Sequence, residues 1–191
     1  MLEYEKKVLL TEAEYTCLKK LANDPSLTAT QINHYFDTDD FAMNQKGITY
    51  RVRLKNGMYQ PTIKYHSPES RSDNNCSLEE DREKTTTFNP DAFSDLGLSW
   101  QGTLQTERTV LYKDSFYEMV VDRNTYLGTS DYELEIEYAE GCEAGADRML
   151  IEAGKCLVAS NLLDCEADFL SRVGRSSTKS ERFFEKKKKS F

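Results

Sequence analysis

The sequence predicts an α+β fold in which helices are added to an antiparallel β-sheet. Three observations predict it. Asn56-Gly57 separates two β-rich runs, which is a strong signal for a tight hairpin. Several runs alternate polar and apolar residues, as a strand with two different faces requires. The longest helical pattern comes late, after residue 143, without an internal repeat or a linker before it. One domain of ordinary size is therefore expected.

The first half of the chain is expected to open with a strand over residues 1–10. Thr11 then acts as an N-cap, and Glu14 three residues later completes a capping box, so a helix is expected from residue 11 to about 22. Further strands are expected at 31–36, 48–54, 58–65 and 76–86, with loops over 37–46 and 67–75.

The second half is expected to begin with a short helix, capped by Asn89 or Asp91 and ending at Leu96. A second hairpin then joins 104–112 to 116–124, and a strictly alternating strand follows at 131–138. Helical spacing predicts two final helices, at 144–160 and 166–173.

The net charge of −8 argues against indiscriminate binding to nucleic acid or to anionic membranes. The basic run Lys186–Lys189 is the exception, and it is expected to be a solvated end rather than a targeting signal. No signal peptide and no apolar run of membrane-spanning length is recognisable. A cytoplasmic protein without membrane partners is expected.

The cysteines and histidines offer little material for a zinc site or a Ser-His catalytic group. The five cysteines are scattered without a C-x-x-C pair, which is typical of reduced thiols in a cytosolic protein. The only two histidines, His34 and His66, are expected to be incidental.

Charged side chains recur at every second position of the expected strands, so that each set shares one strand face. These sets are Glu3/Glu5/Lys7, Arg51/Arg53, Thr62/Lys64, Glu118/Asp122 and Glu133/Glu135/Glu137. One such face alone is typical of a sheet with one side in water. The repetition, with apolar residues on the reverse faces, favours a barrel whose apolar side packs outward against helices and whose interior is polar.

An interior carrying both signs of charge suits phosphoryl-transfer chemistry. Clustered carboxylates raise one another's pKa unless a cation relieves them, and hard divalent ions such as Mg²⁺ or Mn²⁺ prefer oxygen ligands. Arginine and lysine in the same space favour a polyanion, since guanidinium geometry matches phosphate oxygens. The pattern therefore predicts a metal-dependent enzyme for phosphorylated substrates.

An ordered set of short motifs resembles the CYTH superfamily, the triphosphate tunnel metalloenzymes. The set opens with Glu3-Tyr4-Glu5-Lys6-Lys7, which resembles an E-x-E-x-K signature. It continues with N-x-Y-F-D-T-like residues 33–38, R-x-R residues 51–53, T-x-K residues 62–64, the glutamates at 133–137 and a closing region at 179–182. The resemblance implies an eight-stranded antiparallel β-barrel tunnel over residues 1–184, with flanking helices and a basic C-terminal tail at 185–191.

The resemblance also implies roles for individual residues. The implied metal ligands are Glu3, Glu5, Glu135, Glu137 and Asp122, with Glu133 as an alternative to one of the glutamates. The implied triphosphate-binding residues are Lys7, Arg51, Arg53, Lys64, Arg108, Lys179 and Arg182. Two departures stand out: the inward-facing residues of the charged run 78–83 are not evident, and the order Lys179-Ser180 reverses the usual Ser-Lys.

The expected reaction is hydrolysis of the terminal phosphoryl group of a triphosphate, with Glu5 or Glu137 positioning the attacking water. Tripolyphosphate is the first expected substrate because it needs no pocket for an organic group. The alternatives are a nucleoside or thiamine triphosphatase, a class IV-type adenylyl cyclase and a non-catalytic polyphosphate-binding module. A homodimer is compatible with the sequence.

Overall fold

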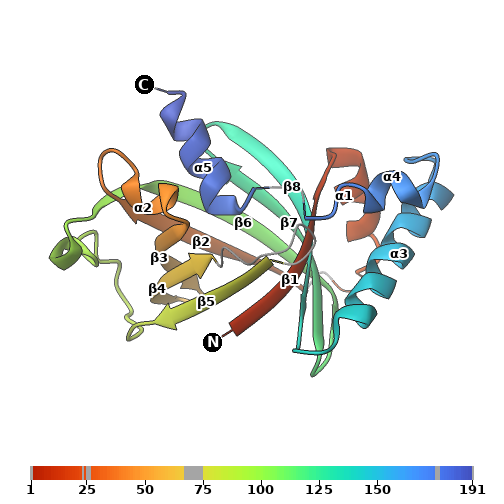
Figure 1. Ribbon diagram of the computed structural model, residues 1–191, viewed down its shortest axis with the longest axis horizontal. Helices are drawn as coiled ribbons and strands as arrows, with labels where there is room; N and C mark the ends of the chain where they lie inside the picture. Colours follow the sequence, from red (N-terminus) through yellow and green to blue (C-terminus); the bar gives the residue numbers. More distant parts are fainter. Residues whose placement is uncertain (1, 23, 25–26, 67–74, 175–176, 191) are drawn as a thin grey trace.

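Eight antiparallel strands close into a barrel in the order β1-β5-β4-β3-β2-β6-β7-β8 (Figure 1). The computed structural model describes residues 2–22, 24, 27–66, 75–174 and 177–190, and the side chains of residues 2, 3, 75 and 76 are not described. Flanking helices complete the fold, so the predicted eight-stranded barrel with helices is confirmed.

The strand bounds follow the predicted runs, with most strands longer than expected. They are β1 Leu2–Leu10, β2 Thr28–Asp37, β3 Ile48–Lys55, β4 Met58–His66, β5 Asn75–Asp81, β6 Ser99–Lys113, β7 Tyr117–Tyr126 and β8 Thr129–Tyr138. The β3–β4 turn has Asn56 and Gly57 at φ 53° and 74°, the left-handed pair that a two-residue hairpin turn requires.

Five α-helices lie in the described part of the chain. They are α1 Glu12–Lys19, α2 Ala42–Gln45, α3 Glu143–Ala159, α4 Glu166–Leu170 and α5 Lys179–Lys188. The predicted capping box of α1 is present: the Glu14 N–H donates to Thr11 Oγ1, and the Thr11 N–H donates to Glu14 Oε2 at 2.7 Å. This helix ends at Lys19, three residues before the predicted end.

Helices α1, α3 and α4 lie together on the outer face of the barrel (Figure 1). Their apolar sides pack against outward residues of the strands, including Val8 of β1 and Leu134 and Ile136 of β8, which are all fully buried. These residues alternate with the charged ones of the same strands. The apolar strand faces therefore point outward against helices, and the charged faces point into the barrel, as predicted.

Helix α5 packs against a separate aromatic cluster at the barrel. Phe183 and Phe184 are buried against Tyr35 of β2, with ring centroids 5.0 and 5.9 Å from that ring. Gly102 of β6 makes room for this docking, since a Cβ there would lie 2.9 Å from Phe183 Cζ. The helix continues across residue 184 into the basic run, where Lys187 donates to Gln101 Oε1 at 2.8 Å. The domain boundary at 184/185 stays a prediction.

Three predicted elements were wrong in detail. The loop at 37–46 contains the short helix α2, because Asp37 accepts hydrogen bonds from the backbone N–H groups of Met43 and Asn44. The helix before Leu96 is only a 3₁₀ turn over Ser94–Leu96. The strand predicted at 76–86 ends at Asp81, and most of the loop predicted at 67–75 lies outside the described residues. None of the described helices is long and apolar enough to cross a membrane.

Candidate active site in the barrel interior

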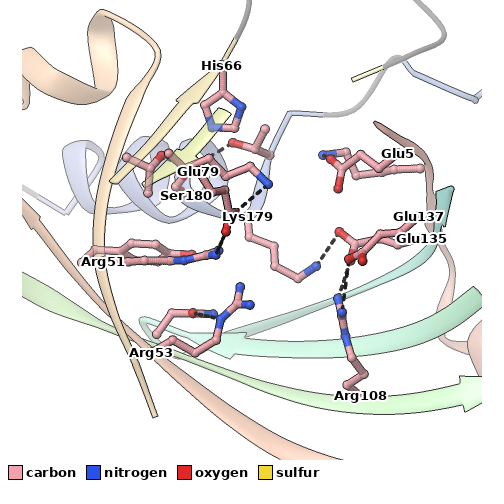
Figure 2. A pocket seen from close by; sticks show the side chains of 16 residues that line it. Glu5, Arg51, Arg53, His66, Glu79, Arg108, Glu135, Glu137, Lys179 and Ser180 are labelled. Carbon is pink, nitrogen blue, oxygen red and sulfur yellow. Dashed lines mark hydrogen bonds and ion pairs between the residues drawn. The ribbon is translucent and has the colours of Figure 1, made fainter. Parts of the chain in front are cut away.

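The barrel encloses a cavity lined almost entirely by charged and polar side chains (Figure 2). Seven strands and the first residues of α5 contribute to it. The lining residues are Glu5, Lys7, Asn33, Tyr35, Thr49, Arg51, Arg53, Lys64, His66, Glu79, Arg108, Glu135, Glu137, Thr178, Lys179 and Ser180. Six are lysine or arginine and four are glutamate, so the interior carries both signs of charge, as the strand patterns predicted.

Two walls of opposite charge face each other across this cavity. The cationic wall consists of Arg51 and Arg53 of β3 and Lys64 of β4. The carboxylate wall consists of Glu5 of β1 and Glu135 and Glu137 of β8. Figure 2 shows Lys179 reaching between the two walls from the start of α5.

Arg53 differs from the other cations of the site in the partner of its guanidinium. In the described part of the chain its hydrogen bond goes to a neutral group, from Nε to Asn33 Oδ1 at 2.9 Å. Burial, together with the neighbouring charges of Arg51 and Arg108, lowers the pKa of its guanidinium to about 10. A buried cation that is held by a neutral amide and crowded by other cations favours an anionic ligand.

Glu79 of β5 lies between two residues of the cationic wall. Its carboxylate accepts from Arg51 Nη2 at 2.8 and 3.0 Å and pairs with Lys64 Nζ at 3.1 Å. Burial acts to raise the pKa of Glu79, but the charges of Arg51 and Lys64 outweigh burial and lower the pKa to about 2. Glu79 thus holds both cations in place from one side and leaves their remaining donors to the cavity.

The Glu79 ion pairs predict a loss of stability in acid. A carboxyl whose folded-state pKa lies below its unfolded value stabilises the fold above pH 4.5, and this contribution disappears as the pH falls towards 2. We expect Glu79→Gln to flatten the decrease in the free energy of unfolding between pH 5 and pH 2, measured by urea denaturation. Glu80→Gln is the matched control, because the Glu80 carboxylate lies on the outer face beside the Tyr65 hydroxyl. Equal slopes in the two variants would contradict the role of Glu79.

A buried acidic cluster lies behind the carboxylate wall. Asp122, Glu133 and Glu135 bring carboxylate oxygens within 4.8 Å of one another. Lys179 Nζ contacts all three, at 2.9 Å from Asp122, 2.7 Å from Glu135 and in a short contact to Glu133. Arg108 adds bonds to Asp122 at 3.0 and 2.7 Å and a contact to Glu135. Burial acts to raise the pKa of Glu135, but Lys179 and Arg108 lower it well below its usual value.

Comparison with known proteins identifies the family. The CYTH domain family model matches residues 1–148. The chain belongs to the CYTH domain family. It is 31% identical over 153 residues to the Bacillus subtilis (strain 168) protein named "Putative triphosphatase YjbK", covering 73% of this chain and 78% of that protein.

Solved structures of low identity share the CYTH fold of this chain. One is a "putative adenylate cyclase" from Bacillus halodurans, with a TM-score of 0.66, 24% identity and coverage of 95% of this chain and 97% of that one. Another is a Hippeastrum protein described as a "putative adenylyl cyclase" with a dominant triphosphatase activity, at a TM-score of 0.58 and 19% identity, covering 80% of this chain and 88% of that one.

The carboxylate wall fits the divalent metal that a CYTH protein is expected to hold. Glu5 lies directly opposite Glu137 in the β1–β8 register, two residues from the Lys7–Glu135 pair. Like charges at directly opposed positions are destabilising, and a shared cation removes that repulsion. Carboxylate oxygens are also the ligands that Mg²⁺ and Mn²⁺ prefer. Glu5, Glu135 and Glu137 are thus the carboxylates of the cavity lining that would hold such an ion.

Two predicted CYTH site residues, Asp122 and Arg182, do not line the cavity in the described part of the chain. The side chain of Glu3 lies outside that part. Asp122 is fully buried behind the wall, where Arg108 and Lys179 already occupy its carboxylate. Arg182 pairs with Asp131 at 2.8 Å and Glu133 at 3.0 Å, an arrangement that fastens α5 to β8. The predicted roles of Glu3 and Asp122 as metal ligands and of Arg182 in triphosphate binding stay predictions.

Some cavity residues were not singled out from the sequence. Asn33 and Tyr35 lie in a recognised CYTH motif, whose alternation places both on the inner face of β2. Glu79 belongs to a run without alternation, and only its pairing with Lys64 in the β4–β5 register reveals its direction. His66, expected to be incidental, lines the cavity, whereas His34 lies outside it against Phe88, with ring centroids 4.2 Å apart.

Proposed function

We propose that this protein is a divalent-metal-dependent triphosphate hydrolase, with inorganic tripolyphosphate as its first substrate. The observation that carries the proposal is Arg53, a buried guanidinium with a neutral partner that faces a carboxylate wall suited to a metal. The name of the related protein YjbK, a "Putative triphosphatase", supports the same reaction class.

In the proposed mechanism the phosphate chain lies along the cationic wall. Arg51, Arg53 and Lys64 bind its oxygens, while Lys7 and Arg108 stabilise charge from the opposite side. A bound Mg²⁺ or Mn²⁺ would neutralise charge on the phosphate oxygens and assist the attack of water. Glu5 and Glu137 would orient that water by accepting its hydrogen bonds. No covalent intermediate is required.

The composition of the lining supports tripolyphosphate as the substrate. Apart from the rings of Tyr35 and His66, the described lining residues are aliphatic polar or charged. Organic groups are usually bound by predominantly apolar and aromatic surfaces. A substrate consisting of phosphate alone therefore matches this cavity better than a nucleotide or thiamine triphosphate does.

The deciding experiment is phosphate release from tripolyphosphate, ATP and thiamine triphosphate, each with Mg²⁺, Mn²⁺ or EDTA. We expect rapid release from tripolyphosphate that EDTA abolishes. A preference for ATP or thiamine triphosphate would change the proposed substrate but leave the proposed reaction unchanged. Formation of cyclic AMP from ATP would indicate a class IV-type adenylyl cyclase. Tight tripolyphosphate binding without any turnover would indicate a binding module and overturn the proposal.

A further inference from the structure

His66 is the last residue of β4 and lies on the cavity wall near the start of α5. Its backbone N–H donates to Gly47 O at 2.9 Å, which fixes the residue beside β3. Glu181 of α5, Lys64, Lys7 and Glu5 all act electrostatically on its imidazole. Figure 2 shows His66 beside Glu79 and Ser180, so the residue lies between the cationic wall and the start of α5.

The imidazole carries a buried nitrogen that lacks a partner. In the described part of the chain, two buried side-chain nitrogen or oxygen atoms have no hydrogen-bond partner, His66 Nε2 and Arg51 Nε. Buried polar atoms in folded proteins are nearly always hydrogen-bonded, and each exception requires an explanation. Both atoms belong to residues that line the same cavity, so a group bound in the cavity could supply the missing partner.

The imidazole is a neutral hydrogen-bonding group rather than another cation. Burial and the charges of Lys64 and Lys7, opposed by those of Glu181 and Glu5, lower its pKa to about 4. A neutral imidazole has one N–H donor and one acceptor nitrogen, and the partner present decides which nitrogen carries the proton. Lys64 and Lys7 in the same cavity favour an anionic partner, and a phosphate oxygen can accept a hydrogen bond from Nε2.

We propose that His66 donates an Nε2–H hydrogen bond to a phosphate oxygen of the substrate and so contributes to recognition of the triphosphate. The inference rests on the proposed function, since it assumes that the cavity binds a triphosphate. The proposal assigns a substrate contact to a residue outside the ordered sequence motifs. It also distinguishes a hydrogen bond donated by a neutral side chain from the attraction of the surrounding charged side chains.

The first test is ¹⁵N NMR of the two histidines during titration with a bis-methylene triphosphate analogue, which cannot be hydrolysed. His34 provides an internal control, because its Nδ1 is within hydrogen-bond distance of Thr103 Oγ1 outside the cavity. We expect the His66 Nε2 resonance to move to the position of a protonated, hydrogen-bonded nitrogen as the analogue binds, and the His34 signals to stay unchanged. The variants His34→Gln and His66→Gln assign the signals.

The second test is the affinity for the analogue, measured by calorimetry. His66→Leu removes the donor, so we expect the dissociation constant to rise about tenfold, the usual effect of losing one hydrogen bond to a charged group. His66→Gln restores an N–H donor and is expected to stay within about threefold of the unchanged protein. His34→Gln is expected to have no effect.

Analogue binding that leaves the His66 resonance unmoved would overturn the proposal, and Nε2 would then be explained by a water molecule. Unchanged affinity in His66→Leu would overturn it as well. If His66→Leu does not fold, the spectra of the unchanged protein decide. Failure of the analogue to bind the unchanged protein at all would instead reject the proposed function, so the two failures are distinguishable.

Discussion

Replacing Arg53 with methionine is expected to weaken triphosphate binding by about 10²- to 10⁴-fold. A guanidinium can form two parallel hydrogen bonds to a phosphate, and bonds between charged groups contribute about 1.5–3 kcal/mol each. The methionine keeps much of the volume and the apolar stem but removes the charge. The dissociation constant of the bis-methylene triphosphate analogue measures the loss directly.

The same substitution is expected to leave the fold intact or to stabilise it. Arg53 is buried and its hydrogen bond goes to the neutral Asn33, so the free protein bears the desolvation of a charge that the more distant carboxylate of Glu79 offsets only in part. We expect the free energy of unfolding to stay level or rise by about 1 kcal/mol. Arg123→Met is the control, because Arg123 is exposed on β7. A loss of stability with unchanged binding would show that Arg53 has a structural role.

The charged barrel interior was predictable where polar and apolar residues alternate cleanly. Arg51 and Arg53 flank Val52, and Glu135 and Glu137 flank Ile136, so one face of each strand had to be charged whatever its neighbours were. The reverse faces needed apolar cover, which α1, α3 and α4 provide for Ile136, whereas Val52 packs in a second cluster with Phe36, Ile63, Phe93 and Leu98. Strand alternation therefore determined both the lining of the barrel and its outer contacts.

The alternation of polar and apolar residues cannot show which side chains face the barrel interior where every residue is charged. Residues 79–84 are all charged, so their sequence contains no signal for which side chains point inward. The pairing of β5 with β4 decides which of these side chains point inward, since Lys64 lies opposite Glu79 and Thr62 lies opposite Asp81. Glu79 was missed for this reason, although it organises the cationic wall.

Long-range contacts explain the remaining differences from the sequence-based predictions. Lys179 and Arg182 are three residues apart and were expected to bind substrate together, yet Lys179 reaches the cavity while Arg182 fastens α5 to Asp131. Their separation depends on where α5 docks, which the Phe183 contacts near Gly102 determine. The helix α2 likewise depends on Asp37, whose side chain reaches across six residues to the Met43 N–H.

Replacing Glu5 with glutamine is expected to lower metal-dependent turnover by about 10²- to 10⁴-fold, the range associated with losing a group that positions or activates water. Glu5 lies opposite Glu137 in the strand register, and in the proposed mechanism a shared divalent ion would relieve the repulsion between these two charges. The amide keeps the shape of the side chain but removes one charge from that pair. The turnover number with tripolyphosphate, measured across a range of Mg²⁺ concentrations, reports the loss.

Stability provides a second measurement. In EDTA, Glu5→Gln is expected to be about as stable as the unchanged protein, because relief of the repulsion between Glu5 and Glu137 offsets the loss of the ion pair between Glu5 and Lys7 Nζ at 3.5 Å. Mg²⁺ is expected to raise the unfolding temperature of the unchanged protein, since an ion that binds only the folded state stabilises it, and to do so much less in the variant. Glu80→Gln, on the outer face of β5, is expected to match the unchanged protein in both measurements.

If Glu5→Gln keeps full turnover and the full metal response, the ion does not lie at the carboxylate wall. The cluster of Asp122, Glu133 and Glu135 would then be the alternative site, and binding there would require Lys179 to leave the three carboxylates it now contacts.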